Sequence, residues 1–419
     1  MESFFRLKTP KEVFQIIDQF KPLGKETIRI EEALHRILYH DVISPEDLPG
    51  FFRSTMDGYA VRAKDTFGAS ESLPAMLDVT GEVRMGETPD MSLGKGKAVR
   101  ISTGGMLPEG ADGVVMVEYC HLLDESTLEV YRPVSPLENV IPPGDDIKRG
   151  MILLKKGHGL RIQDIGIMAG IGKTNVDVHK RPRVAIISTG DEVIPINDSP
   201  KPGQVRDINR YTLWSLCRSM GAAPVYVGLS ADNFDDLKGM VESGLKQADT
   251  VWISGGSSVG TRDITLRVLE TLQDFKLLVH GISISPGKPT IIGRSGSKPV
   301  IGLPGHVSSA LVVAQIFLTR LVLRLSGHTD TSKEVRREIE AVLSRNIESA
   351  SGREDYIKVK LSCKKGVLTA EPILGKSGLI FPLVEADGMI RVDMNTEGLY
   401  QGQGVKVILF DDLQRGGMT

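Results

Sequence analysis

The sequence predicts an α/β multidomain protein built around a doubly wound, mostly parallel sheet. Between about residues 181 and 328, unbroken apolar runs such as "VAIIS" and "TVWIS" alternate with amphipathic segments such as "NFDDLKGMVESGLKQ". Apolar strands that alternate with helices are typical of a parallel sheet covered by helices on both faces. Because 419 residues exceed what one hydrophobic core usually holds, we expect further domains on both sides of this one.

Changes in sequence character divide the rest of the chain. Short β-branched runs between Gly, Pro and Asp turns predict a β-rich inserted module over 46–146. Helical spacing in "PKEVFQIIDQF" and "RIQDIGIMAGIG", with a short helix expected in "RIEEALHRIL", predicts a helical connecting domain made of 1–45 and 147–180. The doubly wound domain then covers 181–330, and 331–419 returns to short strands, which predicts a small C-terminal domain resembling a β-barrel.

Composition narrows the classes of partner. The formal net charge of −2 predicts no nucleic-acid or membrane partner. The three cysteines are far apart, which argues against a zinc site or a disulfide framework and favours a reducing, cytoplasmic location. Charges interrupt the N-terminal apolar residues, so we expect no signal peptide. In "ALVVAQIFLTRLVLRL" the polar residues Gln315, Arg320 and Arg324 predict a buried helix rather than a membrane span.

Three strands run into loops rich in Gly, Ser and Thr, namely "TGDEV", "GGSSVGTRD" and "LPGHVSSA". Loops at the carboxyl ends of parallel strands gather ligands, and their backbone N–H groups favour phosphate. The acids Glu192, Asp232 and Asp263 lie in or near these loops. Since carboxylates and a phosphorylated ligand repel each other unless a hard cation lies between them, the pattern predicts a Mg²⁺ site for a small phosphorylated molecule.

Other interpretations compete for the same residues. "GIMAGIGKT" (166–174) resembles a P-loop, but the spacing and the order of helix and strand fail, so we read its glycines as a helix stop. Gly256 to Gly260 match the GxSxG elbow of a serine hydrolase, with Ser258 as nucleophile and Asp263, His280 and His306 as partners. Glycines in such turns can also serve only tight packing of a helix on a sheet.

Seven ordered motifs resemble the molybdopterin molybdenumtransferases, the MoeA-type proteins related to the C-terminal domain of gephyrin. They are "STMDGYAVRAKD", "VRISTGGMLPEGADGVVMVE", "PPGDDIKRG", "STGDEV", "SGGSSVGTRD", "PGKP" and "GLPG", and the likeness runs from about residue 10 to 412. The resemblance implies Mg²⁺-dependent insertion of molybdate into adenylylated molybdopterin, with hydrolysis of the phosphoanhydride and release of AMP. It also implies a MogA-like pterin-binding domain, an elongated connecting and dimerisation domain, and a homodimer. A transient contact with a molybdopterin adenylyltransferase is expected.

The motifs carry residue roles over to this chain. The catalytic residues implied are Asp57, Thr103 and Asp146, contributed by the facing subunit, and Glu192, Asp232 and Asp263, of which the last three are also the implied metal ligands. The implied substrate-binding residues are Ser188, Thr189, Gly190, Asp191, Gly255, Gly256, Ser257, Lys288, Pro304, Gly305, Arg353 and Ser377. Arg353 suits an oxyanion, because its guanidinium is a planar fork of donors.

The chain departs from the family pattern beside the anion site. Ser285 stands where the family loop usually has the first lysine of Lys-Pro-Gly-Lys-Pro, and His280-Gly281 occupies a region where many members have another lysine. His306-Val307 follows "GLPG" where members usually have Asn-Pro or His-Pro. These departures leave open a paralogue that prefers tungstate and a non-catalytic molybdopterin-binding scaffold. An adenylyltransferase is a weaker alternative, because the extra modules point to the next step.

Overall fold

The computed structural model describes residues 7–255, 259–328, 338–364 and 366–410. The chain divides into two compact units. The first comprises Met1–Tyr39, Gly157–Arg161 and Asn175–Thr419, and the second comprises His40–Lys156 and Ile162–Thr174. The four domain ranges predicted from the sequence stay a prediction, since two units are a coarser division.

The first unit contains the predicted doubly wound sheet, with strand order β16-β13-β17-β21-β20-β18. Its first four strands pair in parallel. The other two pair antiparallel, which the sequence analysis did not foresee. Only residues 296 and 297 join β20 to β21, and so short a connection permits a hairpin but no crossover. The strands are β13 (Arg183–Thr189), β16 (Ala223–Ser230), β17 (Thr250–Gly255), β18 (Phe275–His280), β20 (Ile291–Ser295) and β21 (Lys298–Pro304).

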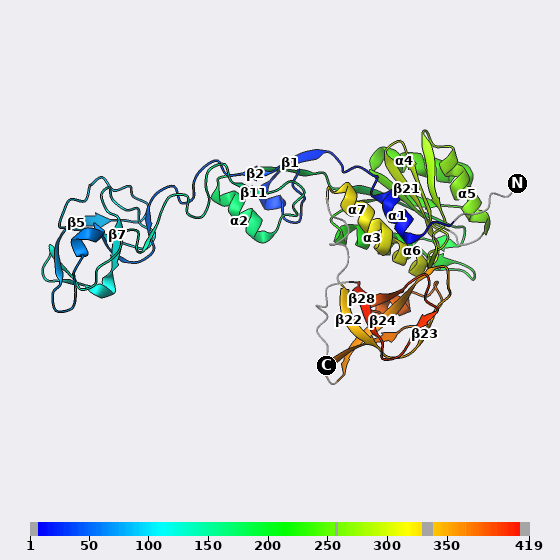
Figure 1. The fold of residues 1–419 in the computed structure, drawn as a ribbon. Coiled ribbons are helices and arrows are strands. Elements are labelled where there is room, and N and C mark those ends of the chain that lie inside the picture. The colour runs from blue at the N-terminus through cyan, green and yellow to red at the C-terminus, as the bar shows by residue number, and fades with distance from the viewer. Residues whose placement is uncertain (1–6, 256–258, 329–337, 365, 411–419) are drawn as a thin grey trace. The chain divides into compact units, whose positions relative to one another are not determined.

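Helices cover both faces of this sheet (Figure 1). Along β13, Val184 and Ile186 belong to one core, and Ala185 and Ile187 belong to another. This alternation follows from the two-residue period of a strand, and it explains why the strand is apolar throughout. The first core includes residues of α1 (Pro10–Ile17), α3 (Asn209–Ser219), α6 (Val307–Val313), the π-helical η4 (Ala314–Leu318) and α7 (Thr319–Leu325), and the second includes residues of α4 (Phe234–Gln247) and α5 (Val259–Glu270).

The helical stretch formed by α6, η4 and α7 is the apolar segment that the sequence predicted to be buried. Among the described residues, Val307–Leu325 is the one stretch long and apolar enough to cross a membrane by length and composition. However, 67% of that apolar window is buried inside the protein. Ile316, Phe317 and Leu321 are almost fully enclosed by the first core, so this stretch is the central core helix of the α/β domain.

One local prediction about a helix end and one about a helix are settled by the structure. The N-terminal end of α4 is capped by Asn233, because its side chain accepts the backbone N–H groups of Asp235 and Asp236. Gly172, which follows α2 (Ile162–Gly170), has the positive φ expected of a helix stop. The helix predicted in "RIEEALHRIL" is wrong apart from the 3-10 turn η1 (Ile30–Glu32). The neighbouring backbone pairs instead, through β1 (Lys25–Arg29) with β12 (Asn175–His179) and through bridges at Ile37 and Leu38.

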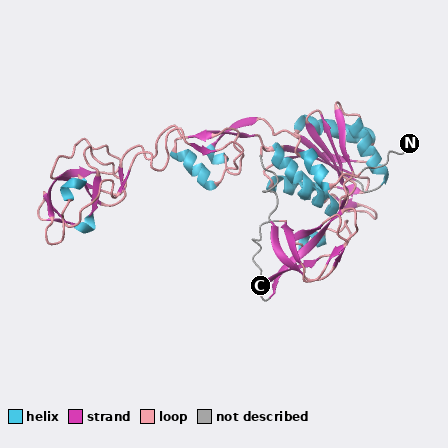
Figure 2. Ribbon diagram, viewed as in Figure 1, coloured by secondary structure: helices cyan, strands magenta, loops and turns pink. Residues whose placement is uncertain are grey.

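The C-terminal part of the first unit closes into a five-stranded barrel, as the sequence predicted (Figure 2). The order is β24-β25-β22-β28-β26, and β26 pairs back onto β24. The short strand β19 (Ile284–Ser285) extends this sheet by pairing in parallel with Glu354 and Asp355 of β24. The elements are β22 (Glu338–Leu343), β23 (Ile347–Glu348), β24 (Glu354–Lys364), β25 (Val367–Pro372), α8 (Phe381–Glu385), β26 (Gly388–Val392), β27 (Gly398–Leu399) and β28 (Gly404–Leu409).

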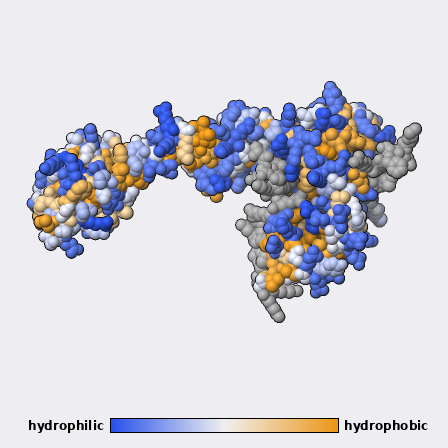
Figure 3. Space-filling view, in the orientation of Figure 1, coloured by the Kyte–Doolittle hydropathy of each residue, from blue (hydrophilic) through white to orange (hydrophobic). Residues whose placement is uncertain are grey.

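The second unit contains the predicted β-rich part, which forms a six-stranded sheet of order β7-β4-β6-β5-β9-β8 with an apolar cluster on each face. Hydrophilic residues interspersed with smaller apolar areas cover the visible surface of both units (Figure 3). The elements of the second unit are β2 (Val42–Ile43), β3 (Arg53–Ser54), β4 (Gly58–Val61), η2 (Ala63–Thr66), β5 (Ala75–Val83), β6 (Lys97–Ile101), β7 (Gly113–Met116), η3 (Val117–Tyr119), β8 (Cys120–Leu122), β9 (Thr127–Val130), β10 (Val140–Ile141), β11 (Ile152–Leu154) and α2 (Ile162–Gly170).

Candidate functional site

A pocket of about 290 Å³ lies at the carboxyl ends of β13, β17 and β21. Open α/β sheets bind their ligands at this edge. We call it the edge pocket. Its lining includes the predicted residues Ser188, Thr189, Glu192, Gly255 and Gly305, together with His306, Asp207, Asn209 and residues of the short strands β14 (Val193–Ile194) and β15 (Val205–Arg206).

Two polar residues of the edge pocket escaped the sequence analysis. Asp207, which is 5% exposed, accepts the Ser188 hydroxyl at 2.6 Å and the backbone N–H of Arg210 at 3.0 Å. The Asn209 amide donates to the Ser254 hydroxyl at 2.8 Å and to the Gly305 carbonyl at 2.7 Å, which ties two strand ends together. Its buried Oδ1 has no partner among the described residues. The only signal in the sequence is "DIN" at the start of α3, which looks like an ordinary helix start.

Acidic residues gather on one side of the edge pocket. The Thr189 hydroxyl donates to Asp232 at 3.2 Å, and the backbone N–H of Asp232 donates to Asp191 at 3.0 Å. Burial raises the pKa of Asp232, and the negative charges of Asp191 and Glu192 raise it further. No described lysine or arginine forms an ion pair with these three carboxylates.

The structure describes only part of the set of metal ligands that the motifs imply. Glu192 lines the edge pocket, and Asp232 adjoins it through Thr189. The side chain of Asp263 lies outside the described residues, as do Gly256, Ser257 and Ser258. Within the described part of the chain, no three His, Cys, Asp or Glu side chains are grouped to hold a metal. The assignment of Glu192, Asp232 and Asp263 as metal ligands therefore stays a prediction.

Two glycines of the strand ends are required by local geometry. A Cβ on Gly255 would lie 1.9 Å from Cγ2 of Thr189, its neighbour on β13. Gly190 has a φ of +141°, and a Cβ there would lie 2.8 Å from Oε2 of Glu192. The absence of a side chain at Gly255 is therefore explained by strand packing, without invoking a ligand.

A second cavity, of about 730 Å³, lies between the α/β domain and the barrel, and we call it the barrel cavity. It brings together Lys288, Pro304, Arg353 and Ser377, which the sequence places up to 89 positions apart (377 − 288). These four residues were predicted to share a site. His306 lines both pockets, and the backbone continues from Pro304 in this cavity to Gly305 in the edge pocket.

Hydrogen bonds join the barrel to the start of α6. The Ser377 hydroxyl lies 3.0 Å from Nδ1 of His306, and the backbone N–H of Ser308 donates to the Ser377 carbonyl at 3.1 Å. These contacts give His306 a structural role. They also explain how a loop of the barrel reaches the strand ends of the sheet.

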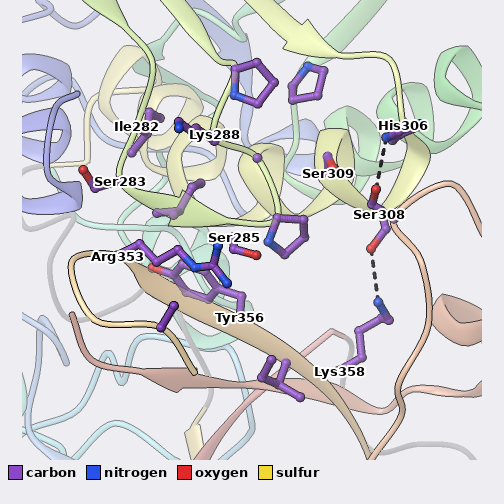
Figure 4. A pocket seen from close by; sticks show the side chains of 18 of the residues that line it. Ile282, Ser283, Ser285, Lys288, His306, Ser308, Ser309, Arg353, Tyr356 and Lys358 are labelled. Atoms are coloured by element: carbon purple, nitrogen blue, oxygen red, sulfur yellow. Dashed lines mark hydrogen bonds between the residues drawn. The ribbon is translucent and has the colours of Figure 1, made fainter. Parts of the chain in front are cut away.

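The barrel cavity is lined by cationic side chains (Figure 4). Lys288 is exposed. The Arg353 Nε lies 2.9 Å from Oδ1 of the buried Asp355, while 45% of the arginine side chain stays exposed. Lys358 is only 7% exposed, and its Nζ donates to the Ser308 hydroxyl at 3.3 Å. Burial lowers the pKa of Lys358. The sequence analysis did not single out this lysine.

The three residues assigned to a facing subunit lie in the second unit. The pairing of Gly58 with Ile101 brings Asp57 beside Thr103, whose backbone N–H and hydroxyl donate to Oδ1 of Asp57 at 2.7 and 3.1 Å. These bonds lower the pKa of Asp57, the backbone bond most. Asp146 is exposed and, within this fully described unit, makes no hydrogen bond to either residue. The structure thus joins Asp57 and Thr103 by hydrogen bonds, but it does not join Asp146 to them in this way.

Three family models match the chain in order. They are the MoeA N-terminal region with domains I and II over residues 8–172, a probable molybdopterin binding domain over 185–324, and the MoeA C-terminal region with domain IV over 340–410. The central model coincides with the sheet that carries the edge pocket, and the last coincides with the barrel. Fold and site therefore define a multidomain protein of molybdenum cofactor biosynthesis.

Relatives that match this chain over nearly its full length narrow this class of protein. A molybdopterin biosynthesis protein of Methanocaldococcus jannaschii is 34% identical over 95% of this chain and 96% of its own length. A Bacillus subtilis protein named molybdopterin molybdenumtransferase is 30% identical over 95% and 93%. The crystal structure of a MoeA protein from Pyrococcus horikoshii, 38% identical, superposes with a TM-score of 0.85 over 97% of this chain and 100% of that one. The chain belongs to the MoeA family of molybdopterin molybdenumtransferases, a family of transferases.

Proposed function

We propose that this protein inserts molybdate into adenylylated molybdopterin in a Mg²⁺-dependent reaction that releases AMP. The observation that carries the proposal is the pair of adjoining pockets that share His306. One pocket gathers carboxylates at the strand ends, and the other gathers lysine and arginine side chains. A phosphorylated substrate held through a divalent cation suits the first pocket, and a free dianion suits the second.

In the edge pocket, the backbone at the strand ends and the polar groups of Ser188 and Asn209 would hold the phosphorylated pterin. The residues present fit Mg²⁺, because hard carboxylate oxygens gather there without an ion pair to any described lysine or arginine, Arg206 of the same pocket included, and because burial and the neighbouring carboxylates raise the pKa of Asp232. Glu192, Asp232 and Asp263 would hold the ion, with Asp191 beside them. When bound, Mg²⁺ offsets the negative charge of the phosphoanhydride and of the leaving AMP.

In the barrel cavity, Lys288, Arg353 and Ser377 would bind molybdate, with Pro304 shaping the wall. Hydrolysis breaks the P–O bond of the phosphoanhydride, water supplies the oxygen of the new phosphate, and AMP departs. The two dithiolene sulfurs of the pterin then bind the molybdenum of the molybdate held in the adjoining cavity, while an oxygen of the molybdate leaves as water with the two thiol protons. Contiguity of the two pockets supports this order, since substrate and oxyanion are held side by side.

We further propose that the working form is a cytoplasmic homodimer in which Asp57, Thr103 and Asp146 of a second copy complete the site. The fixed geometry of Asp57 and Thr103 supports this role, because their hydrogen bonds keep an exposed carboxylate ionised. The substrate is a small molecule, delivered by a transient contact with a molybdopterin adenylyltransferase. No nucleic acid or membrane takes part.

The test is AMP release from adenylylated molybdopterin by the purified protein with Mg²⁺, in parallel with molybdate and with tungstate. We expect AMP release and a metal-containing pterin, faster with molybdate. Tungstate is the second candidate, because Ser285 departs from the family pattern in the wall of the barrel cavity and Val307 departs from it in the wall of the edge pocket. Tight pterin binding without AMP release under either anion would contradict the proposal and leave a binding scaffold.

A further inference from the structure

Lys358 is the buried cation of the barrel cavity, and it has too few partners among the described residues. It lies on β24 and is 7% exposed. Its ammonium group carries three N–H donors, yet the structure gives it one acceptor, the Ser308 hydroxyl at 3.3 Å. No described carboxylate forms an ion pair with it. Burying an ammonium group in this state costs free energy, which a bound anion would recover.

A second lysine of the same chain shows how a purely structural lysine is satisfied. Lys298, at the start of β21, is also partly buried, but its ammonium group donates to the backbone carbonyls of both Leu245 and Ala248. Those carbonyls lie near the C-terminal end of α4, where a cation is favoured. Lys358 has no such carbonyl pair among the described residues. Its position is therefore not explained by packing alone.

The side chains of Ser308 and Arg353 in this cavity offer hydrogen-bond donors to a ligand. The Ser308 hydroxyl that accepts from Lys358 keeps its own hydrogen free, since no described acceptor takes it. Figure 4 shows Lys358 extending towards Ser308 and Arg353 lying beside Ser285; Arg353 immediately precedes β24, and Lys358 lies within that strand. Arg353 shares its charge with Asp355, so Lys358 is the less compensated cation of the two.

We propose that Lys358, held by Ser308, is an oxyanion-binding residue of the barrel cavity and supplies the positive charge that Ser285 does not. Ser285 and Lys358 both line this cavity, so a cation at either position would serve the same site. The ligand is a tetrahedral dianion, recognised by an ammonium group, a guanidinium group and hydroxyl donors. The inference rests on the proposed function, because it names the residue that holds the anion of that reaction.

The direct test is calorimetric titration of the full-length protein with sodium molybdate alone. Lys358→Met should weaken molybdate binding at least about tenfold, as expected for loss of a charged hydrogen bond. Lys358→Arg should retain most of the affinity. Lys360→Met, which removes an exposed lysine two positions along β24, should bind as the wild type does. In Lys358→Met, the further change Ser285→Lys should restore affinity, because it returns a cation to the same cavity.

A stability measurement separates binding from folding. Because Lys358 is a desolvated cation, Lys358→Met should unfold at a temperature no lower than the wild type while binding molybdate more weakly. A wild type that binds molybdate, with Lys358→Met binding it equally well, would overturn this inference and leave the proposed function intact. A wild type that neither binds molybdate nor releases AMP would overturn both.

A measurement on the unaltered protein guards against a variant that fails to fold. Lysine acetylation, followed by mass spectrometry with and without molybdate, should show protection of Lys358 and none of Lys360. Equal labelling of Lys358 in both samples would contradict the inference. Inorganic phosphate serves as the second ligand, because a substrate phosphate has the same shape and charge. Protection by phosphate alone would overturn the assignment to a metal oxyanion.

Discussion

The edge pocket and the barrel cavity lie next to each other and share His306, but they have opposite chemistry. In the edge pocket, Asp207, Glu192 and the neighbouring Asp232 bring negative charge to the strand ends. In the barrel cavity, Lys288, Arg353 and Lys358 bring positive charge. The volumes are about 290 and 730 Å³. Under the proposed function, the two anionic substrates would be held in different ways, one through a bridging cation and the other by direct pairing with cationic side chains.

The two pockets also differ in origin. The edge pocket is made almost entirely by the α/β domain, from the ends of strands that are neighbours in the sheet, with Gly378 contributed by the barrel region. The barrel cavity needs two, because β19 and α6 come from the α/β part while β24 and the loop with Ser377 come from the barrel. Ligand binding in the edge pocket should therefore respond mainly to changes of charge and strand packing. Ligand binding in the barrel cavity should respond mainly to changes at the contact between the barrel and α6.

The largest effect is expected from neutralising the acidic side. Asp232→Asn should lower the rate of AMP release about 100-fold, as does removal of a group that stabilises charge in the transition state. Molybdate binding to the barrel cavity should stay unchanged, since the two pockets hold different ligands. Asp235→Asn, at an exposed acid of the same segment, is the matched control and should act as the wild type. Equal rates for Asp232→Asn and the control would remove Asp232 from the reaction.

The next effect concerns the strand packing that forms the edge pocket. Gly255→Ala places a Cβ 1.9 Å from the Thr189 methyl group and should lower the free energy of unfolding by about 1–3 kcal/mol, as overpacking does. Adding Thr189→Ser removes that methyl and should recover most of the loss. Denaturant unfolding measures both.

Gly239 provides the control for this change. It lies within α4 with open space around it, so Gly239→Ala should raise stability by up to about 1 kcal/mol. A Gly255→Ala protein as stable as Gly239→Ala would show that the close approach of β13 and β17 is not needed.

A smaller effect is expected at the junction of the two pockets. His306→Ala and Ser377→Ala each remove the contact of 3.0 Å between the ring and the hydroxyl, worth about 0.5–1.5 kcal/mol. The concentration of molybdate for half-maximal rate should rise about 2- to 10-fold with little change in kcat. In the double variant the losses should be less than additive. Full additivity would mean that the two side chains act independently.

The smallest effect concerns pH. Burial and the nearby carboxylates raise the pKa of Asp232 in the folded protein, so the folded state favours its protonated form. This contribution to stability is present below the unfolded pKa and is lost as the pH rises through the folded one. Asp232→Asn should therefore be slightly more stable than the wild type at neutral pH, by a few tenths of a kcal/mol after solvent screening. The gain should vanish in acid, and thermal unfolding across pH checks this.

The pattern of strand-end loops predicted the edge of the sheet well. Apolar strands alternating with helices are a local signal, and parallel strands bring their carboxyl ends to one edge wherever the helices cross over. Ser188, Thr189, Glu192, Gly255 and Gly305 could thus be assigned to one place. Asp207 and Asn209 could not be assigned to it, because in the sequence "DIN" at the start of a helix looks the same as an ordinary helix cap. Only the packed structure shows their side chains bonded to Ser188 and Gly305.

The sequence by itself determined the order of strands and helices, the β-rich and barrel-like parts, and the motifs that identify the family. Tertiary structure alone decided the antiparallel edge of the sheet, the replacement of a predicted helix by strand pairing, and the place of Lys358. That lysine meets Ser308 across 50 positions of sequence and loses its water only when the barrel packs against α6. Burial and long-range contact depend on how whole elements pack, so no local pattern of residues encodes them.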